Sequence, residues 1–252
     1  MGILIFQESE VAVSKRGESK SLSADVYSRI RDEIYNGTLA PGSRLQPSVL
    51  GERYSASTTV IREALALLAG ERLVQSRTGQ GFFIPMINKD ELLDLTTVLC
   101  HVEGLALRMS MERGGLEWES SLIAAHHRLA RTPRRTEKNP DRYSQDWSNA
   151  HKEFHATLLG ACDVPLLLDM CQQLMLATEL YRVWVSPLVT HNKRDYAGEH
   201  AALLEAVLAG DAQTAVSLLN EHAHTTANMI VENWPANTEQ MIADGMAKYG
   251  VE

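Results

Sequence analysis

The sequence of 252 residues lacks the features that mark secreted and membrane-spanning proteins. It has no run of about 18 apolar residues, so no segment could cross a bilayer as a helix. Its first 20 residues place a short apolar patch before their charges, which is the wrong order for a signal peptide. Its three cysteines, Cys100, Cys162 and Cys171, are odd in number and lack CxxC spacing. This usage predicts a cytoplasmic protein with reduced thiols.

Beyond residue 88 the sequence also lacks strand-like alternation and any Rossmann glycine signature. Segments with helical periodicity alternate there with short breaks, which predicts an antiparallel all-helical bundle. The expected helices cover residues 89–113, 116–131, 141–159, 165–185, 195–209 and 212–233. The length supports two domains. We expect a flexible tail over residues 1–20, a first domain over 21–85, the bundle over 86–236 and a loosely ordered C-terminus over 237–252.

The first domain has a different pattern. Leu22, Val26, Ile30 and Ile34 recur every four residues and predict an amphipathic helix. The remaining expected elements are a short helix from Leu45 to Tyr54, a third helix capped by Ser57 and ended by Gly70, and strands at 73–76 and 82–84. In this order the elements predict a winged helix-turn-helix, so the fold class is mostly α.

The N-terminal end of the third helix carries the side chains suited to a DNA groove. Thr58, Thr59 and Arg62 lie on its polar face and offer short donors and a cation. Gly79 and Gly81 lie in the turn between the strands, where they can adopt positive φ or approach a phosphate closely. Each element alone also fits a small packing domain in which Arg62 pairs with a nearby acid. The whole series in this order favours DNA binding.

The segments GTLAPGSRL, VLGERYSAS and VIREALALLAGERLV, with the glycine-tipped turn, resemble the DNA-binding domain of the GntR family of bacterial regulators. The resemblance covers residues 21–85 and implies binding to double-stranded operator DNA. It places Arg44 on a phosphate, Thr59 and Arg62 at recognition-helix contacts, and Gly81 at the wing tip. Many members have arginine where Thr58 stands, so base preference at that contact does not carry over.

Net charge is distributed unevenly along this acidic chain, which carries −8 in total. Residues 21–85 hold seven arginines, no lysine and six acidic residues, a balance of +1, whereas residues 86–252 carry −9. The acidic surplus therefore lies outside the proposed DNA-binding domain. Since +1 gives only a weak attraction to phosphates, we expect a homodimer that doubles the contacts.

Four histidines of the bundle predict a metal site. His151 and His155 are spaced i and i+4, so both rings leave one face of a helix and could share an ion. His200 and His222 lie among apolar residues on two later helices. A lone buried histidine is more often a core residue than a ligand, and the i, i+4 pair alone does not decide between the two. The four together favour a site.

The segments HKEFHATL at 151–158 and EHAALLEAVLAGD at 199–211, with His222, resemble the FCD ligand-binding domain of the FadR branch of GntR regulators. The resemblance implies a helical bundle that holds a divalent metal, commonly zinc or nickel, and a small carboxylate effector. It matches His155, His200 and His222 residue by residue. His151 stands where the family has aspartate and matches by position only. Imidazole suits zinc, nickel, copper or iron and disfavours magnesium and calcium.

The front of the domain departs from the family in a second way. Members often carry arginine four residues before a glutamate in the first helix, and here Leu99 precedes Glu103. An arginine often credited with holding the effector carboxylate is therefore missing. The metal, Arg108 or Arg182 would have to replace it, and His101 is close enough in sequence to line the pocket.

We therefore predict a cytoplasmic, homodimeric, DNA-binding transcription regulator, a repressor and not an enzyme. Its bundle would bind a metal and a small organic acid, and the effector would shift the dimer between arrangements that fit or misfit the operator. One alternative is a metal-dependent, hydrolase-like enzyme in which Glu153 or Glu199 serves as base, although Glu153 points away from the ligands of its helix. Another alternative is a regulator whose bundle only dimerises, with the histidines in its core.

Overall fold

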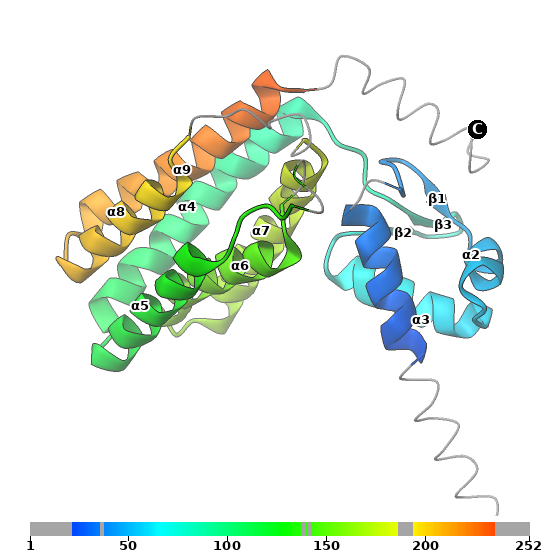
Figure 1. Cartoon of the computed structure of the whole chain (residues 1–252), viewed down its shortest axis with the longest axis horizontal. Helices are drawn as coiled ribbons and strands as arrows, with labels where there is room; N and C mark the ends of the chain where they lie inside the picture. The colour runs from blue at the N-terminus through cyan, green and yellow to red at the C-terminus, as the bar shows by residue number, and fades with distance from the viewer. Residues whose placement is uncertain (1–21, 36–37, 138–139, 141–142, 186–193, 235–252) are drawn as a thin grey trace, which may run out of the picture. The chain divides into compact units, whose positions relative to one another are not determined.

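The structure is a computed structural model that describes residues 22–35, 38–137, 140, 143–185 and 194–234. These residues form two compact units, one ending at Met86 and the other beginning at Ile87 (Figure 1). The first unit is a winged helix-turn-helix and the second a helical bundle, which confirms the predicted fold class. The expected tails, residues 1–20 and 237–252, lie outside the described residues.

The first unit begins with a helix over residues 22–35 and continues through two helices and three short strands. Its elements are β1 (Arg44–Leu45), α2 (Pro47–Tyr54), α3 (Thr58–Gly70), β2 (Gln75–Arg77) and β3 (Gly81–Phe83). The antiparallel sheet has the order β1-β3-β2. The Ser57 hydroxyl accepts a hydrogen bond from the Val60 amide at 3.3 Å and so caps α3. Fully buried Ile30, Ile61 and Leu65 contribute to the core of this unit.

The strands differ from the predicted ones in position and in number. Leu45, which we expected in the second helix, belongs to β1 and is paired with Phe82, while the helix starts at Pro47. A strand of two residues is too short to show a period-2 pattern, so β1 could not be predicted from periodicity. Leu73 and Val74 precede β2 and are buried, which means that their apolar character reflects core packing.

The second unit consists of six helices among the residues that the structure describes. They are α4 (Lys89–Arg113), α5 (Leu116–Arg131), α6 (Gln145–Gly160), α7 (Pro165–Val185), α8 (Tyr196–Leu208) and α9 (Ala212–Glu232). The long helix α4 packs along α9, α7 and α6, while α5 packs on α6 and α8 (Figure 1). None of the helices in the described ranges has both the length and the apolar character needed to cross a bilayer.

Side-chain caps fix where α6, α8 and α9 begin. Ser144 accepts from the Trp147 amide at 3.1 Å, so α6 starts at Gln145, later than the expected start at residue 141, which is itself outside the described residues. Asp195 and Asp211 cap α8 and α9 in the same way. The fully buried ring of Phe154 on α6 lies in the core beside these helices. Local capping chemistry therefore sets the positions of the helices that carry the predicted histidines.

The tight turn of the helix-turn-helix gives a first test. A methyl group on Gly51 would lie 2.8 Å from the Ala56 carbonyl oxygen, whereas one on Gly70 would meet no atom within 4 Å. We expect Gly51→Ala to destabilise the unit by about 1–3 kcal/mol through overpacking. The matched change Gly70→Ala should be neutral or stabilise by up to about 1 kcal/mol. Hydrogen exchange of peptides covering residues 47–70 measures both effects, and equal protection in the two variants would contradict the expectation.

Candidate functional site

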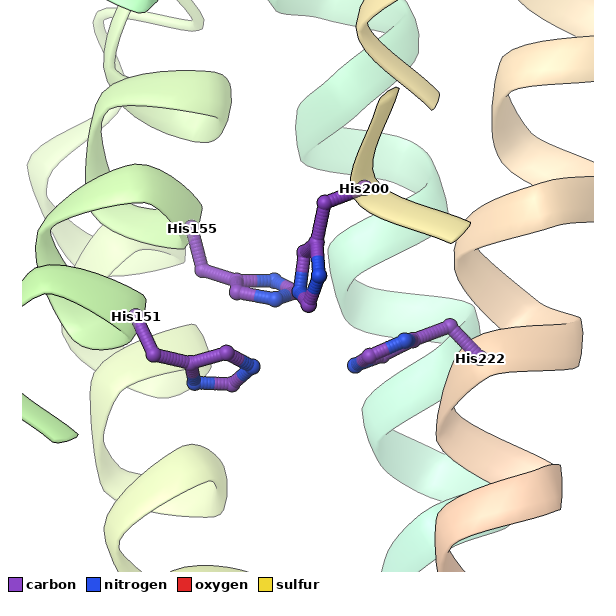
Figure 2. Close-up of side chains that lie close together, drawn as sticks. All are labelled: His151, His155, His200 and His222. Carbon is purple, nitrogen blue, oxygen red and sulfur yellow. The ribbon is translucent and has the colours of Figure 1, made fainter. Parts of the chain in front are cut away.

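Four histidine side chains converge inside the bundle (Figure 2). His151 and His155 project from α6, His200 from α8 and His222 from α9. One nitrogen from each ring can be chosen so that all four lie within 4.8 Å of one another. The structure thus brings together all four residues that the sequence predicted as metal ligands.

Hydrogen bonds orient two of these rings from behind. The Nδ1–H of His200 donates to the Tyr196 carbonyl oxygen at 2.6 Å, and the Nδ1–H of His222 donates to Glu199 Oε2 at 2.8 Å. With the proton on Nδ1, each ring keeps an Nε2 lone pair for an ion. Within the described part of the chain, Nε2 of His155 and Nε2 of His200 are buried and have no hydrogen-bond partner. Buried nitrogens in this condition fit a metal ion.

Glu199 is held in place by an arginine as well as by His222. Arg194 donates from Nε to Glu199 Oε1 at 2.5 Å and from Nη2 to Glu199 Oε2 at 2.6 Å. Burial by itself would raise the pKa of Glu199, but hydrogen bonds from His222 and Arg194 outweigh it and lower the pKa to about 2. The carboxylate therefore stays charged and fixes the proton of His222 on Nδ1. The sequence offered Glu199 as a possible base and gave no sign of Arg194.

The four imidazoles are neutral in the absence of a metal. Burial is the main cause that lowers the pKa of each ring, followed for His151 by the neighbouring His155. The shift brings the pKa of His200 to about 3. Metal binding requires unprotonated imidazole, so the apo state already presents the right form. Nitrogen donors of this kind can hold zinc, nickel, copper or iron.

A cavity of about 80 Å³ adjoins the cluster and has room for several water-sized groups. His151, His155 and His222 form one part of its wall. Its charged side chains are Glu103 on α4, Lys152 on α6, and Glu179 and Arg182 on α7. Leucine, methionine and alanine side chains provide much of the remaining lining, so the cavity suits a small molecule with few polar groups.

Only one of the three predicted effector residues lines this cavity. Arg182 is buried, donates from Nε to Glu179 Oε2 at 2.8 Å, and stacks 5.2 Å from the Trp147 ring centroid. His101 and Arg108 are exposed on α4 and do not line the cavity. They lie on other faces of the helix than Glu103, which points inward. Of the two arginines offered as replacements for the missing effector arginine, Arg108 is solvated and Arg182 lines the cavity.

Neither glutamate considered as a general base is free to act as one. Glu153 is exposed and pairs with Arg128 at 2.8 Å, away from the histidines. Glu199 is engaged by Arg194 and by the ring of His222. The cluster thus combines nitrogen ligands with a small cavity, but neither glutamate is available there as a general base.

The first unit presents a second candidate surface, built from α3 and the β2–β3 turn. Arg44, Arg62 and Gly81 line one surface hollow together with Arg77 and Gly79. Thr58 and Thr59 are exposed in the first turn of α3. Both glycines have positive φ, 74° and 98°, a backbone conformation that favours glycine. Three of the five predicted contact residues therefore line this hollow, and the other two are exposed on the same helix as Arg62.

Sequence reasoning missed Arg77 as part of that surface. Its guanidinium lies 4.6 Å from the Phe83 ring centroid, and its Nε donates to Gln75 at 3.1 Å. These contacts hold a third arginine in the lining of that hollow. The position of Arg77 next to a glycine-rich turn could have indicated its place on this surface.

Comparisons with known proteins agree with the geometry of both units. The model of bacterial regulatory proteins of the gntR family matches residues 22–84, and the FCD domain model matches residues 94–225. The uncharacterized HTH-type transcriptional regulator BphR of Paraburkholderia xenovorans is 33% identical over 213 residues, which are 84% of this chain and 86% of the relative. The HTH-type transcriptional repressor GlaR of Escherichia coli is 30% identical over 220 residues, 85% and 98% of the two chains. The solved structure of E. coli McbR/YncC has the same fold, with a TM-score of 0.65 at 19% identity, over 85% of this chain and 99% of that one.

The lowered pKa values of the histidines predict how acid affects the metal-free protein. An unfolded chain binds protons at histidine below pH 6.5, while folded His200 resists protonation down to about pH 3. Stability should therefore fall as pH drops from 6.5 to about 5, by up to about 1.4 kcal/mol per pH unit for each buried histidine. Urea unfolding of chelator-treated protein measures this slope.

Two variants control this measurement. His200→Gln should flatten the slope, whereas exposed His224→Gln should leave it unchanged. A stability that does not change with pH across this window would contradict the neutral buried cluster.

Proposed function

Because the chain belongs to the GntR family of bacterial regulatory proteins and is a DNA-binding transcriptional regulator with an FCD domain, we propose that it is a metal-containing, effector-controlled repressor. The observation that carries this proposal is the convergence of four neutral histidines beside a cavity. We place the repressor in the cytoplasm, where its operator DNA lies.

The metal is a divalent transition ion, zinc or nickel, held by His151, His155, His200 and His222. Support comes from the buried Nε2 atoms of His155 and His200, which have no hydrogen-bond partner among the described residues, and from the Glu199 carboxylate behind His222. An all-nitrogen ligand set favours these ions over magnesium or calcium. When bound, the ion would supply a Lewis acid that takes the carboxylate of an effector. His151 replaces the carboxylate ligand usual in the family and removes one negative charge from the ligand set.

The effector is a small carboxylate that occupies the cavity beside the histidines. Arg182 is one of two cations on its wall, with Lys152, and is positioned by Glu179 and by the Trp147 ring. An anion bound there would contact α6, α7 and α9, which are distant in sequence but adjoin one cavity. Its binding can therefore favour one arrangement of these helices over another and shift the regulator between states with different DNA affinity.

The regulator acts on operator DNA as a homodimer. The first unit brings only +1 of net charge over residues 21–85, so one copy gains little from phosphate attraction. Two copies double these contacts and read two half-sites. The relative GlaR is named a repressor, which supports repression relieved by the effector. A catalytic role is disfavoured because Glu153 and Glu199 are both engaged elsewhere.

The recognition helix gives a direct test of DNA binding. Arg62→Ala should weaken binding to promoter DNA next to the protein's own gene by about 1–3 kcal/mol if Arg62 contacts a base edge. Arg131→Ala removes the same charge from an exposed position at the end of α5 and serves as the control. Fluorescence anisotropy over a range of salt concentrations measures both affinities. An Arg62→Ala affinity equal to that of the wild type would show that the assignment of α3 is wrong.

The metal centre has its own test. Full-length protein purified without chelator should contain zinc or nickel at close to one ion per chain by elemental analysis. Glu199→Gln weakens the acceptor behind His222 and should lower metal affinity about 10- to 100-fold. Glu205→Gln changes an exposed glutamate on the same helix and should leave it unchanged. A metal content of the wild-type protein well below one ion per chain would contradict the metal proposal. It would leave the DNA-binding assignment unaffected.

A further inference from the structure

Glu103 is a buried carboxyl group that the metal site does not use. It projects from α4 into the cavity wall and is only 3% exposed. It does not belong to the cluster of converging ligand nitrogens. Within the described ranges no protein group forms a hydrogen bond or an ion pair with it, and burial raises its pKa to about 8. A polar group buried in this way is costly to the fold unless something pairs with it.

The other charged groups of the cavity wall are paired with one another. Glu179 receives hydrogen bonds from Arg182 and lies 3.7 Å from the Lys152 ammonium. Arg182 also reaches the Ser148 hydroxyl at 3.4 Å. One turn before Glu103 the wall is formed by Leu99, which brings no charge. Glu103 thus stands as a separate polar point on a largely apolar wall.

We propose that Glu103 selects the effector, and that the effector is a small carboxylic acid that also bears a hydrogen-bond donor, a hydroxyl or an ammonium, directed at the Glu103 carboxyl. This inference rests on the proposed function, because it assumes that a carboxylate binds beside the histidines. Glu103 lines the same cavity of about 80 Å³ as His151, His155 and His222, so a small molecule held beside the histidines can also meet Glu103. The histidine cluster and Glu103 can therefore contact the same small molecule.

The chemistry of the carboxyl group sets the discrimination. A carboxyl oxygen accepts a hydrogen bond whether the group is ionised or protonated, so a hydroxyl or an ammonium is satisfied in either state. An acid without the donor places a methyl group against Glu103 and leaves it unpaired. A dicarboxylate brings a second negative charge to a largely apolar wall, where burial penalises a charged carboxylate as it already penalises ionised Glu103. Both should bind at least about tenfold more weakly.

The test uses metal-loaded, full-length protein and isothermal titration calorimetry. The probes are butyrate, its hydroxy and amino derivatives, and succinate, which share a four-carbon frame. At least one hydroxy or amino acid should bind about tenfold or more tightly than butyrate and succinate. A preference between hydroxy and amino acids identifies the donor. Equal binding of butyrate or succinate, or no binding by any donor-bearing acid, would overturn the role of Glu103.

Variants separate recognition from folding. Glu103→Met removes the carboxyl at similar size, so it should abolish the tenfold preference while metal content stays unchanged. It should also raise the thermal midpoint, because an unpaired buried carboxyl is lost. Glu112→Met on the exposed side of the same helix is the control and should keep the preference. A lowered midpoint with the preference retained would assign Glu103 a structural role.

The failure of this inference can be told apart from the failure of the proposed function. If butyrate or succinate binds as tightly as the donor-bearing acids and releases the protein from DNA, the effector-controlled repressor stands and the role of Glu103 fails. If the protein contains no metal and no acid changes its DNA affinity, the proposed function is wrong. The inference about Glu103, which depends on it, is then wrong as well.

Discussion

The burial of four imidazoles at one point is the constraint on which the bundle depends. Neutral imidazole in a core still carries lone pairs and N–H groups that need partners. Tyr196 and Glu199 satisfy the outer nitrogens of His200 and His222, so both rings keep fixed orientations. The inner nitrogens then face one another, and helices α6, α8 and α9 must be in register for that arrangement to form. The same register of the helices places His151, His155 and His222 in the wall of the cavity.

The charges around the histidine cluster determine which ligands can bind there. A divalent ion held by four neutral ligands would keep its full positive charge, which favours an anion beside it. On the nearby wall Arg182 and Lys152 share Glu179, which leaves one positive charge to attract an anion. Glu103 is the acidic group left over, and it limits which anions fit. On the DNA-binding unit the balance of +1 makes affinity depend on pairing two copies, so control of the dimer amounts to control of binding.

Much of the fold could be predicted because its signals are local. The amphipathic stripe from Val26 to Ile34, the Ser57 cap and the limits of α4 and α5 each depend on residues close in sequence. The His151–His155 pair could be predicted for the same reason, because residues i and i+4 share a helix face. Strand β1 escaped prediction because Arg44 and Leu45 are a strand only through their pairing with β3. The burial of Arg182 could not be predicted, because it depends on Glu179, Trp147 and the packing of α7 in the bundle.

The sequence by itself determined the helix periods, the caps, the glycine-tipped wing and which residue types could bind an ion or DNA. Only the tertiary structure decided that His200 and His222 reach the α6 pair, that Arg194 fixes Glu199, and that Glu103 faces the cavity while His101 and Arg108 face solvent. Contacts along a helix follow from a fixed rise and rotation per residue. Contacts between helices depend on how side chains far apart in sequence pack together.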